Sequence, residues 1–112
     1  MLKKKFRLAD FSLERPSQIS TEFFNLKFSR NEINSKRMAF VVSKKIDKRA
    51  TVRNELKRKT RAAFENLFDQ IKDGHDFLVY PRIGVKDVTS KEVGITLKST
   101  LSKNKLLKDE KN

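Results

Sequence analysis

The sequence predicts a single domain of the α/β class (α+β), in which a small β-sheet packs against helices. Apolar and polar residues alternate over 21–30 and 36–43, as in half-buried strands. A long helix with one apolar flank is expected over 52–72, and the apolar run 75–80 before Pro81 predicts a third strand. With 112 residues, 37% of them hydrophobic, the chain has material for one modest core.

The N-terminal arm, residues 1–20, is basic and irregular. We expect a short helical turn near 8–14 and a break in the chain at Pro16-Ser17. The arm should pack two or three apolar side chains on the domain. It should leave three cationic side chains in water: Lys3, Lys4 and Lys5.

The two alternating runs should form neighbouring strands. Alternate residues from Phe24 to Phe28 share one face, which leaves Phe23 exposed beside polar groups on the other. Alternate residues from Met38 to Val42 share a face of the second strand. The polar residues 31–35 have turn chemistry, and so short a connection favours an antiparallel hairpin.

The central helix combines a basic face with an apolar flank. Thr51 is the expected N-cap, and the helix should run from about Val52 to Lys72 and stop at Gly74. At about 100° per residue, Leu56 falls on an apolar flank that is turned toward the core. Five polar residues share the remaining face: Arg53, Asn54, Lys57, Arg58 and Arg61.

The C-terminal part should hold one more helix. Thr89 and Glu92 have capping-box spacing, so a helix should run to about Ser102. Three of its residues should face inward: Val93, Leu97 and Leu101. Residues 103–112 should fray, and we place the domain at 1–107, with 108–112 as a disordered basic tail.

The charge balance restricts the classes of partner. Lys and Arg outnumber Asp and Glu by 27 to 14, which gives a formal net charge of +13. Self-repulsion of this size is relieved by an anion, such as nucleic acid, a membrane surface or an acidic protein. No apolar run is long enough for a membrane span, and the basic start is not followed by the apolar stretch of a secretory leader. We therefore expect a soluble, cytoplasmic protein.

We predict no catalytic residue and no metal site in the chain. There is no Cys and one His, so metal-ligand clusters are absent from the sequence. His75 beside Asp76 could serve acid–base chemistry, but a polar pair at the start of a strand is the interpretation we favour. The carboxylates stand singly among cations, which argues against a two-metal nuclease centre.

The densest charge lies in segment 43–61. A solvated helix face normally mixes charges of both signs, whereas nine of the eleven charged residues in this segment are cations. Such a surface can neutralise RNA phosphates with release of counterions, and Arg can bind phosphate through two nitrogens. The predicted RNA-binding residues are Lys44, Lys45, Lys48, Arg49, Arg53, Asn54, Lys57, Arg58 and Arg61.

The spacing within this segment closely resembles the signature helix of the bacterial ribonuclease P protein subunit. The pattern is Ala50-x-x-Arg53-Asn54-x-x-Lys57-Arg58-x-x-Arg61, followed by Ala63-Phe64. The strand that ends Val41-Val42-Ser43-Lys44-Lys45 resembles the same family, and the resemblance covers most of residues 1–107. Two features depart from the pattern: Glu55 stands where the family usually has Arg, and the region before the first strand is shorter and contains Pro16.

The resemblance implies a fold and a function. The fold would be a mixed, mostly antiparallel sheet packed against helices, ribosomal S5 domain 2-like, with a left-handed β-α-β crossover. The function would be that of a protein cofactor for a catalytic RNA, which removes the 5′ leader of precursor tRNA by hydrolysing one phosphodiester. The RNA would hold the catalytic Mg²⁺. The partners would be that RNA and precursor tRNA, with no membrane and no DNA.

The resemblance also implies a surface that guides the single-stranded leader. Exposed aromatic side chains beside cations suit that task, because bases stack on the rings while the cations meet phosphates. The candidates are Arg7, Phe11, Phe23 and Lys27. For Phe11 and Phe23, ordinary core packing is an equal alternative.

Other functions remain to be weighed against this one. The main alternative is a structural RNA-binding protein of the ribosome-associated type, with the same charge and no role in tRNA processing. A membrane-surface module would need an exposed apolar helix face, and here that face is better used in a core. A protein-only nuclease would need metal ligands that the sequence lacks.

Overall fold

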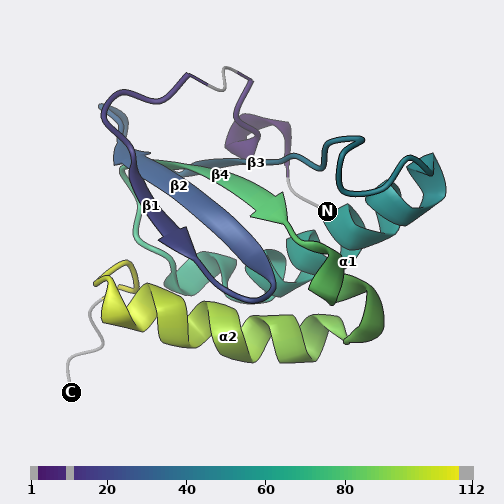
Figure 1. The fold of residues 1–112 in the computed structure, drawn as a ribbon. Coiled ribbons are helices and arrows are strands. Elements are labelled where there is room, and N and C mark those ends of the chain that lie inside the picture. Colours follow the sequence, from purple (N-terminus) through teal and green to yellow (C-terminus); the bar gives the residue numbers. More distant parts are fainter. Residues whose placement is uncertain (1–2, 10–11, 109–112) are drawn as a thin grey trace.

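One four-stranded sheet and two α-helices make up most of the chain (Figure 1). In this computed structural model, residues 3–9 and 12–108 are described. The elements are η1 (Lys4–Phe6), β1 (Ser17–Ser20), β2 (Phe24–Arg30), β3 (Arg37–Phe40), α1 (Ala50–Asn66), η2 (Phe68–Gln70), β4 (His75–Pro81), η3 (Ile83–Asp87) and α2 (Ser90–Lys103), where η marks a 3₁₀ helix. The described helices include none that is long and apolar enough to cross a bilayer.

The strand order is β1-β2-β4-β3. The β1–β2 and β2–β4 pairs are antiparallel and the β3–β4 pair is parallel, which confirms the mixed, mostly antiparallel sheet. The chain therefore makes a β3-α1-β4 crossover, whose left hand stays a prediction. The predicted hairpin between the runs 21–30 and 36–43 is wrong, because β4 lies between β2 and β3.

The position of β4 has a physical reason. Most of its residues are buried on both faces of the sheet, as expected for a central strand. The polar turn 31–35 packs against the start of β4 instead of closing a hairpin: the Asn31 N–H donates to the Gly74 carbonyl, and the Gly74 N–H donates to the Ser35 carbonyl, both at 2.9 Å. Gly74 has φ +79°, a conformation that favours glycine.

The edge strand β1 was not predicted. It has one apolar residue, Ile19, so alternation gives almost no signal there. Its pairing with β2 begins opposite Phe28, directly after the predicted break at Pro16. Prolines are tolerated at the start of an edge strand, which is where this one lies.

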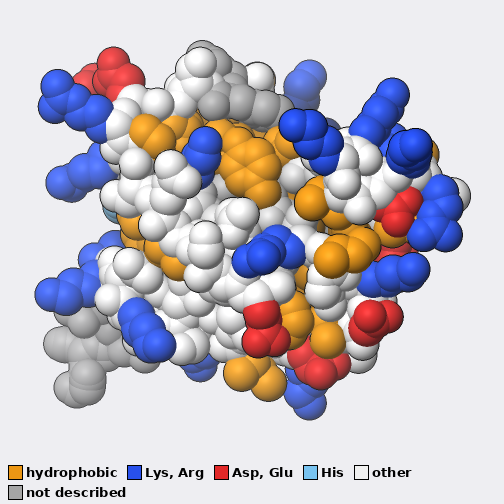
Figure 2. Space-filling view, viewed as in Figure 1, with side chains coloured by type: hydrophobic (Ala, Val, Ile, Leu, Met, Phe, Trp, Pro, Cys, Tyr) orange, Lys and Arg blue, Asp and Glu red, His pale blue; other side chains and the backbone are white. Residues whose placement is uncertain are grey.

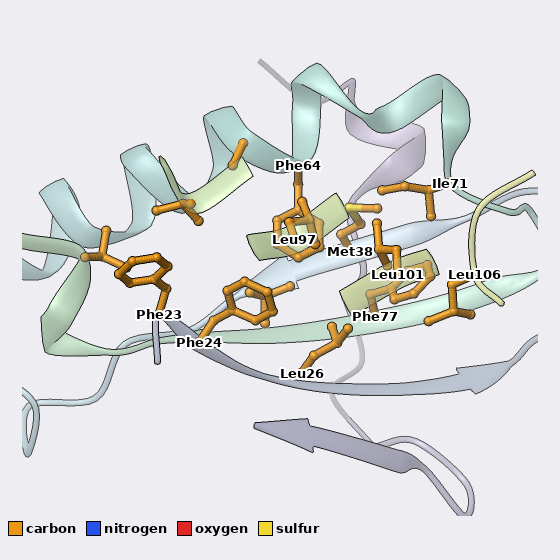
Figure 3. Packing of buried hydrophobic residues seen from close by; sticks show 14 of the residues in the cluster. Phe23, Phe24, Leu26, Met38, Phe64, Ile71, Phe77, Leu97, Leu101 and Leu106 are labelled. Atoms are coloured by element: carbon orange, nitrogen blue, oxygen red, sulfur yellow. The ribbon is translucent and has the colours of Figure 1, made fainter. Parts of the chain in front are cut away.

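Both α-helices cover one face of the sheet, and the core lies between the two layers (Figures 1 and 3). Phe64 of α1 is fully buried between Phe24 and Phe40, with ring centroids at 5.8 and 5.4 Å in edge-to-face geometry. The three predicted inward residues of α2 are fully buried: Val93, Leu97 and Leu101. At about 25 cal/mol per Å² of apolar surface, burial of such side chains is the main stabilising term.

The N-terminal arm reaches both faces of the sheet. Phe6 of η1 packs edge-to-face on Phe68 of η2, with centroids 4.8 Å apart. Leu8 joins a second, smaller apolar cluster with Ala39 and Leu78 on the face away from the helices. The three predicted lysines are exposed: Lys3, Lys4 and Lys5.

The ends of α1 differ from the prediction. The N-cap position is Arg49, with no side-chain cap, so Thr51 lies inside the helix. At its other end the helix stops at Asn66, and η2 redirects the chain so that Ile71 becomes fully buried. Over 67–72, the burial of the Ile71 side chain outweighs the propensity of these residues to continue the helix.

The segment after α2 is ordered through residue 108, which corrects the predicted fraying from 103. The capping box is confirmed, since Thr89 Oγ1 accepts from the Glu92 N–H at 3.2 Å. Beyond the helix, Leu106 is buried and its carbonyl accepts from the Lys72 N–H at 2.8 Å. The Lys108 N–H donates to the Gln70 carbonyl at 2.7 Å. Residues 109–112 lie outside the described residues.

Candidate nucleic-acid interface

The predicted RNA-binding residues lie on one end of the molecule, where the loop 43–49 leads into α1. Figure 2 shows Lys and Arg side chains gathered over this end, at the right of the view. The three loop lysines are exposed: Lys44, Lys45 and Lys48. The first turn of α1 has no acidic side chain, and in the described chain a carboxylate meets the helix start only from the preceding loop, where that of Asp47 accepts from the N–H of the N-cap residue.

Asp47 fixes the shape of the loop. Its Oδ1 accepts from the Arg49 N–H at 2.8 Å and from Arg49 Nε at 3.1 Å, and its Oδ2 accepts from Arg49 Nη2 at 3.0 Å. Hydrogen bonds from Arg49 lower the pKa of Asp47 to about 2. The Asp47 side chain is 14% exposed whereas that of Arg49 is 63% exposed, so the cation remains available to solvent.

Arg53 ties the loop to the helix. Its Nη1 donates to the carbonyl oxygens of Asp47 at 3.1 Å and of Lys48 at 2.8 Å. The guanidinium therefore has a structural role in addition to its charge. It holds the loop that presents Lys48 close to its own face of α1.

Glu55, the departure from the family pattern, lies beside Arg58. Arg58 Nη2 is 2.7 Å from both oxygens of Glu55, and Lys59 Nζ is 3.7 Å from Glu55 Oε2. The hydrogen bond from Arg58 lowers the pKa of Glu55. Glu55 thus accepts hydrogen bonds from the Arg58 guanidinium, which was predicted to contact RNA. The Arg58 side chain is still 66% exposed.

Arg61 marks the boundary between the basic face and the core. Its guanidinium lies over the Phe40 ring, 5.4 Å from the centroid. One turn further along α1, Phe64 is fully buried beneath Phe24 and Phe40. The sheet covers the lower part of the helix face and leaves the upper part to solvent, where Asn54 and Arg58 are exposed and Lys57 is half-buried. All nine predicted residues therefore belong to one surface, which we call the α1 surface.

Lys59 was not among the predicted residues, and it has a different role. Its Nζ donates to the carbonyls of Val85, Lys86 and Val88 at 3.4, 3.0 and 2.9 Å. It thereby satisfies carbonyls around η3 and joins α1 to the connection between β4 and α2. Sequence spacing cannot separate such a lysine from its solvated neighbours.

The predicted leader-binding residues do not form one group. Phe23 is 9% exposed and packs in the main core (Figure 3), so the prediction of an exposed ring is wrong. The reason is local: Thr21 Oγ1 accepts from the N–H groups of Phe23 and Phe24, so β2 begins only at Phe24 and strand alternation does not extend to Phe23. Phe11 lies outside the described residues.

Lys27 and Arg7 remain at the surface. Lys27 points away from the helices, and its Nζ lies 5.6 Å from the centre of the Tyr80 ring. Arg7 is exposed and pairs through its backbone with Met38 of β3. Tyr80 is the aromatic residue that the sequence reasoning missed. Alternation within His75–Pro81 would have placed it on the face away from the core, opposite Phe77 and Val79.

His75 and Asp76 do not form an acid–base pair. The Asp76 carboxylate accepts from Arg37 Nε and Nη2 at 2.9 and 2.8 Å and from Asn31 Nδ2 at 2.9 Å. His75 Nδ1 lies 3.0 Å from the Asp73 carbonyl. Within the described ranges, no three His, Asp or Glu side chains gather in a group that could hold a metal ion.

Comparison with known proteins identifies the family that this chain matches. The family model described as ribonuclease P matches residues 2–105. A ribonuclease P protein component from Pseudanabaena sp. is 41% identical over 71 residues, which are 63% of this chain and 61% of that protein, under two thirds of its length. The corresponding component from Syntrophomonas wolfei is 30% identical over 90 residues, 76% of this chain and 75% of that protein.

Solved structures agree in fold. The ribonuclease P protein from Thermotoga maritima superposes with a TM-score of 0.70 at 29% identity, covering 80% of this chain and 84% of that one. That from Staphylococcus aureus superposes with a TM-score of 0.68 at 28% identity, covering 82% of this chain and 84% of that one.

Proposed function

The chain belongs to the bacterial ribonuclease P protein family, and from this premise we propose that it is the protein subunit of a ribonuclease P ribonucleoprotein. In this role it assists a catalytic RNA that hydrolyses one phosphodiester of precursor tRNA. The leader leaves from the 5′ side, and the mature tRNA keeps a 5′ phosphate. The α1 surface is the observation that carries the proposal, because it concentrates cations on one end of a protein whose family model matches residues 2–105.

The proposed partner of the α1 surface is the catalytic RNA. Arginines held at fixed positions, such as Arg49 and Arg53, suit a folded RNA whose phosphates have a defined arrangement. The exposed lysines of the loop add a less directional attraction that releases counterions. Neutralising phosphates in this way lowers the electrostatic cost of folding the RNA and of bringing a second RNA to it.

The proposed catalytic centre belongs to the RNA. In the described part of the chain, the cationic site offers no cluster of carboxylates for a divalent ion, so the residues present do not fit a Mg²⁺ centre of the protein's own. We therefore assign the catalytic Mg²⁺ to the partner RNA. A cytoplasmic location follows from this partnership and belongs to the proposal.

The proposed leader-binding surface is the sheet face away from the helices. Lys27 and Tyr80 lie together there and offer a cation and a ring, the combination that Phe23 was expected to provide. We expect Tyr80→Ala with Lys27→Ala to weaken binding of leader-bearing precursor tRNA several-fold, and to leave binding of mature tRNA unchanged. Equal losses of affinity for both tRNAs would show that the leader does not bind to this face.

The decisive experiment adds purified protein to a bacterial ribonuclease P RNA. The protein should lower the Mg²⁺ concentration needed for cleavage of precursor tRNA, and protein alone should cleave nothing. Cleavage by the protein alone would move the catalytic centre into the chain. No effect on the RNA would favour the structural RNA-binding alternative, which the family membership does not support.

A further inference from the structure

A second cationic surface lies at the opposite end of the molecule, near the start of β4 and the end of α2. Figure 2 shows Lys and Arg side chains along the left of the view, with the histidine among them. Two hollows of about 480 and 610 Å³ lie here, and they share Phe28, Arg30 and His75. We call the two hollows together the distal groove; its further lining includes Arg15, Lys72, Asp73, Lys105 and Lys108.

Among the described residues, the lining of the distal groove has more cations than carboxylates. Its two carboxylates are Glu14 and Asp73. Asp73 is neutralised by Lys36 at 3.1 Å and Lys108 at 3.6 Å. Burial raises the pKa of Asp73, but these cations outweigh that effect and hold it below its usual value. Over residues 3–9 and 12–108, four other lining cations have no carboxylate within ion-pair distance: Arg15, Arg30, Lys72 and Lys105.

The groove also has an aromatic wall. The rings of Phe28 and His75 are 6.5 Å apart, and both lie about as close to Phe77, at 6.2 and 6.1 Å. His75 Nδ1 lies 3.0 Å from the Asp73 carbonyl, and because that carbonyl only accepts, Nδ1 carries a hydrogen. The wall is therefore a set of three neighbouring rings beside cations.

Backbone conformation adds an independent observation. Within the described chain, the non-glycine residues with left-handed φ are Arg15 at 48° and Lys105 at 58°, and both line this groove. Lys105 follows α2 at the position where glycine is usual, and the Leu106 N–H closes the motif on the Leu101 carbonyl at 2.8 Å. A lysine there costs about 1 kcal/mol of strain relative to glycine. The Lys105 side chain therefore lines the groove at a cost in backbone strain after the last turn of α2.

We propose that the distal groove binds a segment of single-stranded RNA, with a base against Phe28 and His75 and the flanking phosphates at Arg30, Lys72 and Lys105. The combination of rings and cations selects this partner, since an acidic peptide would not use the rings and an RNA duplex has its bases stacked inside. The α1 surface lies on the loop 43–49 and on α1 as far as Arg61, whereas the groove is lined by Lys72 and Asp73, which follow the C-terminal end of that helix. The protein can therefore hold two separate RNA segments. This inference rests on the proposed function, in that it takes RNA as the partner.

The first test locates the binding site by NMR titration of the full chain. A six-nucleotide single-stranded RNA should shift the ring resonances of His75 and the amide resonances of Lys105, and inorganic phosphate at the same concentration should not. Shifts confined to α1 or to the outer sheet face would overturn the distal groove and leave the proposed function intact. No shift anywhere in the chain would count against both.

The second test separates binding from folding. Lys105→Gly removes the cation and relieves the backbone, so it should raise the melting temperature while weakening the oligonucleotide about threefold. Arg30→Ala with Lys72→Ala should weaken it about tenfold and lower the salt slope by about 1.4, at about 0.7 for each phosphate on a single strand. The matched control is Lys91→Ala with Lys98→Ala, which removes the same charge from exposed positions of α2 outside the groove. Equal losses of affinity in the control and in the groove variant would show that net charge alone drives binding, and this would overturn the proposal.

Discussion

The α1 surface and the distal groove are both rich in cations, but they hold them differently. On the α1 surface each arginine has a partner inside the protein: Arg49 has Asp47, Arg53 has two carbonyls, Arg58 has Glu55 and Arg61 has the Phe40 ring. In the distal groove, four lining cations have no carboxylate partner among the described residues. From the density of positive charge alone, the two ends of the molecule would be expected to bind RNA in the same way.

The difference has a thermodynamic consequence. A side chain already held in one conformation loses less entropy when a ligand binds, so the α1 surface is prepared for one arrangement of phosphates. A cation without an internal partner can adjust its position to the phosphates of a flexible RNA strand, but its side chain loses conformational entropy when it binds. We therefore expect shape selectivity at the α1 surface and broad tolerance in the groove.

The largest expected effect is that of Arg53. Arg53→Ala removes a cation and releases the Asp47 and Lys48 carbonyls from the helix, so affinity for the catalytic RNA should fall about tenfold or more. Arg53→Lys should not restore it, because an ammonium group cannot reproduce the planar guanidinium. Binding measured at several salt concentrations decides the matter, and full recovery with Lys would mean that charge alone matters there.

A smaller loss is expected from the loop lysines. Lys44→Ala with Lys45→Ala should weaken RNA binding about fivefold and reduce the salt slope by about 0.7 to 0.9 for each lost phosphate contact. The melting temperature should stay the same, because both side chains are exposed. Lys91→Ala with Lys98→Ala is again the control of equal charge, and a similar loss in that control would speak against a defined α1 surface.

Glu55 should have a modest effect of opposite sign. Glu55→Gln removes the anion that holds Arg58, so affinity for the catalytic RNA should rise about two- to threefold at low salt, and the gain should shrink as salt screens the pair. Thermal unfolding of the free protein gives the companion measurement, with a slightly lower melting temperature expected. A weaker complex would show that the ion pair orients Arg58 for RNA and does not compete with it.

Asp47 should give the smallest effect, visible as a pH dependence. The pKa of Asp47 is about 2 in the folded protein, against an ordinary value of 3.8, and the largest cause is the hydrogen bond from the Arg49 side chain. A lowered folded-state pKa stabilises the protein above the ordinary value, and the contribution is lost as pH falls from about 4 toward about 2. The free energies of unfolding of the native chain and of Asp47→Asn should therefore converge over that range. A gap that stays constant with pH would exclude the ionised carboxylate as its cause.

Sequence patterns identified the features with strong local causes. The two-residue alternation of β2, the capping box of α2 and the basic spacing of α1 each follow from a few neighbouring residues, and the structure has all three. The family resemblance is confirmed by the family model. The helical period places five of the nine predicted residues on one side of α1, and the loop before the helix carries the other four.

Most of the errors have a different cause, which is competition from residues distant in the sequence, and Phe23 is the local exception. β4 enters between β2 and β3 because its residues are apolar on both faces. Phe23 leaves the strand pattern because the Thr21 hydroxyl accepts from the N–H groups of Phe23 and Phe24, so that β2 begins at Phe24 and not at residue 21. Burial of Ile71 and Leu106 ends α1 early and orders the C-terminal segment. The distal groove combines residues from far apart in the chain, so no local spacing reveals it.

The contact between the C-terminal segment and η2 has a consequence for biosynthesis. Leu106 fills a place in the core, and the backbone bonds from Lys72 to Leu106 and from Lys108 to Gln70 join the end of the described chain to its middle. The sheet and α1 are translated well before that segment exists. Until residues 106–108 leave the ribosome, the nascent domain exposes an apolar gap beside Ile71. The core can therefore close only after residues 106–108 have emerged from the ribosome, although the sheet and α1 emerge earlier.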